Sequence, residues 1–242
     1  MGNTLTGMDK ALNKIKEIKA SLDGHMSRIE AHQNNGVFFV DAKNVLISPE
    51  AIIGENTIVY PDVIIEGNCI IGKGVILYPG TRLHNAKIGN YSEIQQSVVL
   101  DSSIGEETTV GPYAYIRPDS VIGSGVKIGD FVEVKNSTIG DGTKVSHLTY
   151  LGDAKIGGHV NFGCGTVIVN YNGKVKQETI IEDHAFIGCN TNLIAPVRVG
   201  RNAYTAAGST ITKDVPANAL AISRVPQENK EGWVEQKGLK KD

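Results

Sequence analysis

An apolar residue, most often Ile, Leu or Val, recurs every six positions along the chain between Val45 and Thr212. The runs keep strict step and are separated by places where the spacing slips. The recurring positions are Ile53, Val59, Ile65, Ile71, Leu77, Leu83, Ile88, Ile94, Ile104, Val110, Ile116, Ile122, Ile128, Val134, Ile139, Val145, Leu151, Ile156, Phe162, Ile168, Ile181, Ile187, Leu193, Val199, Thr205 and Ile211. A period of six accommodates short strands, whose side chains alternate with a period of two, but it does not fit the helical period of 3.6. The pattern therefore predicts one short strand and one turn in every six residues.

Three such units complete a triangular coil, and about 160 residues provide about nine coils. The recurring side chains fill a narrow interior that each coil can bury only against its neighbours. Gly directly after the apolar residue, as in Ile53-Gly54 and Ile122-Gly123, is expected to supply backbone freedom at the corners, including positive φ. The alternative is an ordinary β-sandwich with chance periodicity, and the repeated in-step runs argue against it. Triangular coils stacked on one another form a prism. Prisms built from hexapeptide units resemble the left-handed parallel β-helix, so we expect an all-β fold of that class. The left hand comes from the resemblance and does not follow from the spacing.

The segment before the prism has a different period. Apolar residues at three- and four-residue steps over residues 8–31 predict an amphipathic helix that packs against the prism or a neighbour. Gly24 is expected to break or bend this helix. The predicted organisation is a helix and linker over 1–36, with a flexible start at 1–7 and a turn at 34–36, followed by a β-helix domain over 37–226.

Two further segments depart from the repeat. Residues 169–179 are polar and contain Gly, and they interrupt the core pattern. A loop on a rigid scaffold is a common place for function, so this interruption is a candidate site. The repeats fade after residues 213–216, and residues 227–242 form a charged C-terminal arm with the single Trp233.

Composition excludes several classes of function. The formal net charge is −2 and the only basic cluster lies near the end of the chain, so nucleic acid is not an expected partner. No apolar run of 18 residues and no signal core after Met1 are present, so we expect a cytoplasmic protein without a membrane partner. The three cysteines, Cys69, Cys164 and Cys189, have no metal-like spacing and are expected to be reduced thiols.

The richest chemistry lies between residues 116 and 176. Arg117 and Lys135 are 18 residues apart, one full coil, so their side chains should stack on one face about 5 Å apart. Two cations at that separation suit a phosphate group. His147 lies nearby in the sequence and can act as a base near neutral pH.

Longer motifs in this region carry a resemblance to a known family. They are GPYAYIRP (111–118), IGDFVEVKNSTIG (128–140), KVSHLTYLGDAKIG (144–157), VNFGCGTVIVNYNG (160–173), FIGCNTNLIAPV (186–197), AAGSTITKDVP (206–216) and ISRVPQ (222–227). Residues 108–227 closely resemble the acetyltransferase domain of the bacterial bifunctional enzyme UDP-N-acetylglucosamine diphosphorylase/glucosamine-1-phosphate N-acetyltransferase. Weaker similarity extends back to residue 35.

The resemblance implies a role for each matching residue. His147 is expected to be the general base that deprotonates the sugar amine, which then attacks the thioester of acetyl-CoA. Arg117, Lys135 and Lys176 are expected to hold the sugar phosphate, with Lys174 as an alternative to Lys176. Tyr150 and Asn161 would complete the sugar site. The residues expected to line the acetyl-CoA groove are Cys164, Asn170, Tyr171, Cys189, Ala207 and Arg224, with plain packing as the alternative for the two thiols.

The resemblance also implies partners. Acetyl-CoA is the expected co-substrate and no metal is expected. We expect a homotrimer with sites between subunits, in which Arg224 and the 227–242 arm reach a neighbour. The nucleotide-binding loop of the bifunctional enzyme does not precede residue 36, so uridylyl transfer is not expected, and a separate uridylyltransferase remains open as a partner. A natural single-function protein and a fragment are both consistent with this.

The residues alone leave two other functions as alternatives. A zinc carbonic anhydrase needs three converging histidines, and His147, His159 and His184 lack the close paired spacing. A non-catalytic assembly or sugar-phosphate-sensing module is disfavoured because the His, Arg, Lys and Asn-Tyr set is present. Which amino-sugar phosphate is the substrate remains open at this point.

Overall fold

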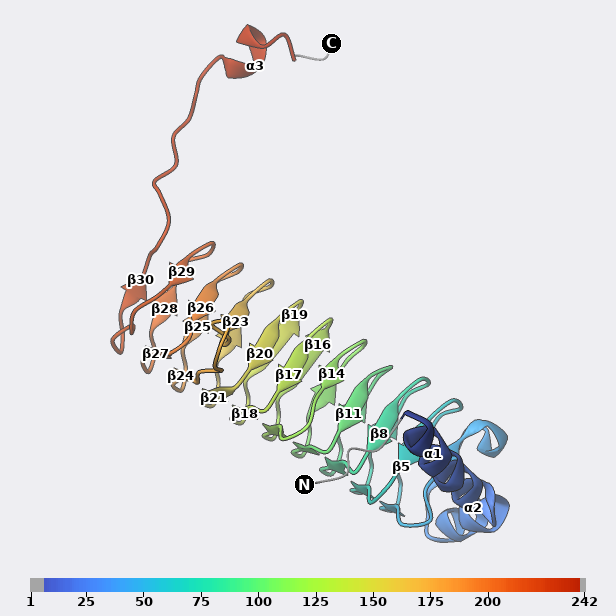
Figure 1. The fold of residues 1–242 in the computed structure, drawn as a ribbon. Helices are drawn as coiled ribbons and strands as arrows, with labels where there is room; N and C mark the ends of the chain where they lie inside the picture. Colours follow the sequence, from blue (N-terminus) through green and yellow to red (C-terminus); the bar gives the residue numbers. More distant parts are fainter. Residues whose placement is uncertain (1–6, 240–242) are drawn as a thin grey trace.

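The computed structural model describes residues 7–239, so the flexible start predicted at 1–7 falls, except for Gly7, outside the described residues. The chain winds into a left-handed parallel β-helix with three sheets, one on each face of a triangular prism (Figure 1). From β1 to β29, successive strands belong in turn to sheets A, B and C, which confirms the fold predicted from the six-residue period.

Every strand is short, as a hexapeptide unit requires, and the three sheets are built as follows. Sheet A contains β1 (Phe38–Phe39), β4 (Ile58–Val59), β7 (Ile76–Leu77), β10 (Glu93–Ile94), β13 (Thr109–Val110), β16 (Lys127–Asp130), β19 (Lys144–His147), β22 (Asn161–Phe162), β25 (Phe186–Ile187), β28 (Tyr204–Thr205) and β30 (Leu220–Ala221). Sheet B contains β2 (Leu46–Ile47), β5 (Ile64–Glu66), β8 (Arg82–His84), β11 (Val98–Leu100), β14 (Tyr115–Ile116), β17 (Glu133–Lys135), β20 (Tyr150–Gly152), β23 (Val167–Val169), β26 (Asn192–Ile194) and β29 (Thr210–Ile211). Sheet C contains β3 (Ile52–Ile53), β6 (Ile70–Ile71), β9 (Lys87–Ile88), β12 (Ser103–Ile104), β15 (Val121–Ile122), β18 (Thr138–Ile139), β21 (Ala154–Ile156), β24 (Thr179–Ile181) and β27 (Val197–Val199).

The core is the column of recurring apolar side chains inside the prism. All of the positions given by the six-residue period are buried. Each strand pairs in parallel with the strand one coil away, as Ile58 pairs with Ile76. The packing energy is therefore spread along the axis, with each coil covering the interior of the next.

The glycines that follow core residues have a different role from the one expected. Gly54 and Gly123 do not adopt positive φ. A Cβ added to Gly54 would lie 2.6 Å from the carbonyl carbon of Gly72 in the next coil. These positions need glycine because two coil backbones approach closely, whereas positive φ occurs at the corners, on residues such as Asn136 and Asp153.

The slips in the period have a structural cause. The apolar spacing shortens to five between Val134 and Ile139 and again between Leu151 and Ile156. Both slips fall at the turn from sheet B to sheet C, which we call the B–C corner. Asn136 and Asp153 occupy this corner with φ of 44° and 52°. A coil with the shorter corner has one residue fewer, and the apolar side chains still point inward.

The ends of the prism extend beyond the sequence pattern. The first strand, β1, precedes Val45, and its Phe39 is buried. A short 3₁₀ helix, η1 (Ala42–Asn44), occupies the first corner and obscures the period there. At the other end β30 pairs with β28 after the recurring pattern has faded.

The N-terminal segment forms two helices, α1 (Gly7–Leu22) and α2 (His25–Asn34), separated at Gly24 with φ of 62°. This confirms the predicted helix and its break. Ile29 of α2 is buried, and Lys14 of α1 forms an ion pair with Glu66 of β5. The other apolar side chains of the segment are exposed in the single chain, namely Met8, Leu12, Ile15, Ile18, Leu22 and Met26. Neither these helices nor any other in residues 7–239 has the length and apolar character needed to cross a membrane.

The C-terminal arm leaves the prism after β30 and ends in α3 (Trp233–Gln236), away from the coils (Figure 1). Trp233 is 45% exposed, and Val225, at 86%, is also uncovered. In the single chain the arm is therefore not packed on the prism.

We expect Ile122→Ala to lower the free energy of unfolding by about 2–5 kcal/mol, because the cavity it leaves cannot close between stacked coils. Val121→Ala on the same strand is the matched control, since Val121 is 52% exposed, and should change it by no more than about 0.5 kcal/mol. Urea denaturation followed by circular dichroism measures both, and equal losses would contradict the inward assignment of Ile122.

Candidate functional site

Arg117 and Lys135 lie on neighbouring coils at the end of sheet B. Ile116 of β14 pairs with Val134 of β17, and the backbone N–H of Arg117 donates to the carbonyl of Val134 at 2.8 Å. The stacking predicted from their spacing is therefore present. Both side chains line a cavity of about 450 Å³ at the B–C corner, together with Pro118, Asp119, Asn136, Asp153 and Lys176.

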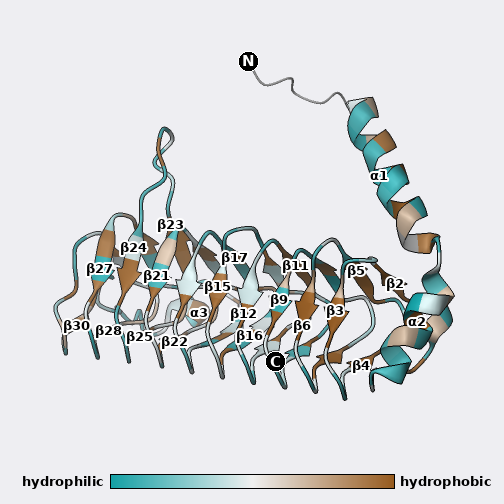
Figure 2. Ribbon diagram, turned by 90° about the horizontal axis from the view of Figure 1, so that it is seen from below, coloured by the Kyte–Doolittle hydropathy of each residue, from teal (hydrophilic) through white to brown (hydrophobic). Residues whose placement is uncertain are grey.

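The loop between β23 and β24 brings Lys176 to this cavity. It makes the coil 25 residues long, from Ile156 to its partner Ile181, and it projects from the prism (Figure 2). The loop turns back on itself through an antiparallel bridge between Tyr171 and Lys176. The backbone N–H of Gln177 then donates to the carbonyl of Asn170 at 2.8 Å. Lys176, and not Lys174, lines the cavity.

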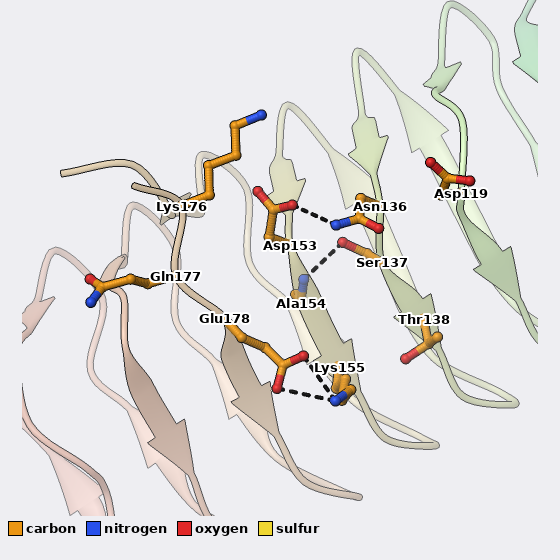
Figure 3. A pocket seen from close by; sticks show the side chains of 10 residues that line it. All are labelled: Asp119, Asn136, Ser137, Thr138, Asp153, Ala154, Lys155, Lys176, Gln177 and Glu178. Carbon is orange, nitrogen blue, oxygen red and sulfur yellow. Dashed lines mark hydrogen bonds and ion pairs between the residues drawn. The ribbon is translucent and has the colours of Figure 1, made fainter. Parts of the chain in front are cut away.

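Asp153 organises the polar side chains around the cavity, and Figure 3 shows its hydrogen bond with Asn136. Its carboxylate accepts hydrogen bonds from Lys135 at 3.2 Å, from Asn136 at 2.7 Å and from the amide of Asn170. Burial alone raises the pKa of Asp153, but these donors outweigh it and the pKa is lowered. The ionised carboxylate thus fixes the position of Lys135.

The three cations are not equally compensated. Arg117 donates to Glu133 at 2.7 Å and Lys135 is paired with Asp153. Lys176 has no carboxylate within ion-pair distance among residues 7–239. The neighbouring Lys135 lowers the pKa of Lys176, and Arg117 adds to this effect, because like charges repel. An anion placed between the three would relieve that repulsion.

Tyr150 and Asn170 lie beside Arg117, Lys135 and Lys176, which we call the cation cluster. Asn170 is buried and its amide donates to the Tyr150 hydroxyl at 3.4 Å. The two fill the space next to Gly152, where an added Cβ would lie 2.4 Å from the Tyr150 hydroxyl and 2.6 Å from the Asn170 amide nitrogen. Gly152 pairs with Lys135 in the neighbouring coil, so its missing side chain makes room for both groups.

A second cavity of about 470 Å³ adjoins the first on the side of sheet C (Figure 3). The two share Asp119, Asn136, Asp153 and Lys176. Lys155 and Glu178 line this second cavity and form an ion pair with an N···O distance of 2.9 Å. The cation cluster is therefore open on more than one side.

His147 lies at a different corner, at the turn from sheet A to sheet B, which we call the A–B corner. Its Nδ1 is 2.7 Å from a carboxylate oxygen of Asp130, its partner in the neighbouring coil. This hydrogen bond is the largest cause that lowers the pKa of Asp130. Because Nδ1 faces the carboxylate, Nε2 remains available to a reacting group.

Asp130 was missed by the sequence reasoning. It precedes His147 by 17 residues, which is one coil of the shorter kind. The one-coil separation that links Arg117 to Lys135 could therefore have linked Asp130 to His147, but only if the coil is counted as 17 residues instead of 18.

The residues expected to bind acetyl-CoA follow His147 along the A–B corner. The pairing of Val145 with Phe162 places Cys164 opposite His147. The backbone N–H of Asn190 donates to the carbonyl of Cys164, and that of Gly208 to the carbonyl of Cys189, both at 2.8 Å. His147, Cys164, Cys189 and Ala207 therefore occupy equivalent positions on consecutive coils. Arg224 lies beside Gly208 at the end of this row.

The single chain does not bring all the expected residues together. Asn161 lies on β22 of sheet A, paired with Lys144, whereas the cation cluster lies at the B–C corner. The Asn170 side chain is directed to the cation cluster and not to the A–B corner. Tyr171 is exposed, and its hydroxyl donates to the carbonyl of Gly173.

The histidines weighed for a zinc site do not converge. His159 and His184 stack on one another with ring centroids 5.2 Å apart. They lie at the turn from sheet C to sheet A, whereas His147 lies at the A–B corner. Within residues 7–239, no three His, Cys, Asp or Glu side chains are arranged to hold a metal ion.

Asp153 makes the stability of the site depend on pH. The pKa of Asp153 in the folded chain lies below the unfolded value of about 3.9, so its ionised form stabilises the fold above that pH, and this is lost as the pH falls through the folded pKa. We expect Asp153→Asn to lower the urea midpoint of unfolding at pH 7. The difference in midpoint between this variant and the wild type should narrow between pH 4 and pH 2. A gap that stays constant over that range would contradict this role.

Family comparisons agree with the repeat. The model described as "GMPPB C-terminal domain" matches residues 42–108, and that described as "Bacterial transferase hexapeptide (six repeats)" matches residues 101–136 and 178–213. Among solved structures, an Arabidopsis UDP-N-acetylglucosamine acyltransferase has a TM-score of 0.45 at 19% identity, covering 74% of this chain and 71% of that chain.

Similarity to curated proteins is much stronger. "Bifunctional protein GlmU" of Clostridium perfringens is 55% identical over 245 residues, covering 99% of this chain and 54% of that protein. The protein of the same name from Clostridium novyi is 59% identical over 212 residues, covering 88% of this chain and 46% of that protein. The chain thus spans about half the length of the curated relatives it matches. With this identity over almost its whole length, the chain belongs to the GlmU family.

Proposed function

We propose that this chain is an acetyl-CoA-dependent N-acetyltransferase that acts on an amino-sugar phosphate. The favoured reaction converts glucosamine-1-phosphate to N-acetylglucosamine-1-phosphate in UDP-GlcNAc biosynthesis. The observation that carries the proposal is the convergence of Arg117, Lys135 and Lys176 on one cavity. Similarity to the GlmU proteins over 99% of this chain supports it, together with the resemblance of residues 108–227 to the acetyltransferase domain of the bifunctional enzyme.

The cation cluster is proposed to hold the phosphate of the sugar. Three cations from two coils and one loop surround a cavity in which Lys176 lacks a counter-ion among the described residues. A phosphate dianion would accept charge-assisted hydrogen bonds from Arg117, Lys135 and Lys176. Tyr150, placed by Asn170 beside the cluster, would meet the sugar ring.

His147 is proposed to be the general base. An ammonium group is not nucleophilic, so the sugar amine must lose a proton before or as it attacks. The Nε2 of His147 would accept that proton while Asp130 holds Nδ1. The new C–N bond forms at the thioester carbonyl, the C–S bond breaks, and the CoA thiolate leaves and takes up a proton. No covalent enzyme intermediate is needed when both substrates are held together.

Acetyl-CoA is proposed to lie along the A–B corner, past Cys164, Cys189 and Ala207 towards Arg224. The proposed assembly is a cyclic homotrimer in which a neighbour's A–B corner and arm complete the site. Such an arrangement would bring Asn161 to a cation cluster that its own chain does not reach. No metal takes part in the proposed reaction, its proposed compartment is the cytoplasm, and uridylyl transfer is assigned to a separate activity.

The first test compares substrates and the base. We expect acetyl transfer to glucosamine-1-phosphate to exceed transfer to glucosamine-6-phosphate and to free glucosamine, because the cluster fixes a phosphate near the anomeric carbon. His147→Ala should lower kcat by about 10²- to 10⁴-fold. CoA release, followed with a thiol reagent, measures both.

His159→Ala is the matched control, because its ring stacks on His184 at another corner, and it should retain wild-type turnover. Unchanged turnover in His147→Ala would overturn the catalytic assignment. Equal rates with free glucosamine would overturn the phosphate site and leave the acetyltransferase assignment standing.

The second test concerns Asp130 as a positioning residue. We expect Asp130→Asn to lower kcat by between about 10- and 10⁴-fold, the range over which loss of an orienting carboxylate acts. The KM for both substrates should change little, because Asp130 lies outside the cation cluster. Asp130→Glu should recover part of the kcat that Asp130→Asn loses. If Asp130→Asn raises KM and leaves kcat unchanged, the positioning role is excluded.

A further inference from the structure

Cys164 and Cys189 are exposed thiols on adjacent coils at the A–B corner. Asn161 and Phe162 of β22 pair with Phe186 and Ile187 of β25, and the same register places Cys164 opposite Cys189. The hydrogen bond from the Asn190 N–H to the Cys164 carbonyl, at 2.8 Å, holds this register at the corner. The two thiols are 25 positions apart in the sequence (189 minus 164), because the loop at 169–179 lies between them.

The spacing of the coils suits a bond between the two thiols. Neighbouring strands lie about 4.8 Å apart, and the Cα atoms of disulfide-bonded cysteines lie about 4.4–6.8 Å apart. The backbones are closely packed here, since a Cβ added to Gly163 would lie 2.4 Å from the backbone nitrogen of Cys189. Gly165, with φ of 77°, follows Cys164 and gives the corner freedom to adjust.

The third cysteine provides an internal contrast. Cys69 is fully buried, and burial raises the pKa of its thiol. Its sulfur accepts the backbone N–H of Ala86. A buried thiol with a raised pKa reacts slowly, so only Cys164 and Cys189 are open to reagents.

We propose that Cys164 and Cys189 form a redox-active dithiol, a modification site that closes into an intramolecular disulfide on reaction with a small disulfide. One thiolate attacks a sulfur of the small disulfide and expels one small thiol, which leaves a mixed disulfide on the protein. The second thiolate attacks the protein sulfur of that mixed disulfide and expels the second small thiol. The protein loses two electrons and two protons, and the small disulfide gains both.

The position of the dithiol couples it to acetyl transfer, and this coupling rests on the proposed function. His147 occupies the equivalent corner position one coil before Cys164. A disulfide would pull the turns at Cys164 and Cys189 towards each other. Both turns lie at the A–B corner, close to where the thioester of acetyl-CoA would approach Nε2 of His147. A shift of about 1 Å in such a place can lower a rate by about 10²-fold.

The test uses the full chain and oxidised glutathione. We expect titratable thiols under denaturing conditions to fall from three to one, with a mass loss of two hydrogens and one disulfide-linked peptide pair containing Cys164 and Cys189. Cys69→Ser should form the same disulfide. Cys164→Ser and Cys189→Ser should each take up one glutathione and form no internal disulfide.

Oxidised protein should lose acetyl transfer by about 10- to 100-fold and recover it on reduction with dithiothreitol. Stable glutathione adducts on both cysteines, or no change in thiol number, would overturn the dithiol. Disulfide formation with undiminished acetyl transfer would overturn its coupling to the reaction. If the reduced protein has no transferase activity, the proposed function fails while the thiol count still decides the dithiol.

Discussion

The stacking of one coil on the next, at the spacing of hydrogen-bonded parallel strands, is the constraint on which this structure depends. Each coil buries its apolar side chains only because another coil covers them, so the backbones must keep a fixed rise of about 4.8 Å. That rise turns sequence separations into spatial columns. Arg117 lies beside Lys135, and Asp130 beside His147, because each pair is one coil apart.

The corners between the sheets hold residues with left-handed backbone. At the A–B corner the left-handed region is occupied by small or polar residues in several coils, such as Gly80, Gly165 and Asn190, but the bulky Tyr113, Phe131 and Leu148 also occupy it, with φ of 59°, 55° and 43°. Such backbone costs about 1–3 kcal/mol at each bulky residue and tends to occur at functional sites. Phe131 follows Asp130 and Leu148 follows His147, so the strained turns are those that carry the hydrogen-bonded pair.

The sequence predicted the repeat well and the corners less well. Every apolar position given by the period is buried, because a narrow core admits only apolar side chains at regular steps. The glycine at position 54 was assigned to a positive φ, yet it serves close contact between coils. The six-residue pattern becomes visible only after the first coil, because η1 disturbs that coil. Contacts between coils and irregular turns leave no periodic signal.

Spacing and residue type alone predict the prism, the break at Gly24, the stacking of Arg117 on Lys135 and the interruption at 169–179. These follow from local spacing and from residue types that permit few alternatives. Only the folded chain shows that Lys176 joins the cations, that Asp153 holds Lys135, that Asp130 holds His147 and that Cys164 lies opposite Cys189 on the next coil. These contacts depend on how a loop folds back and on which corner shortens, and neither is encoded in a period of six.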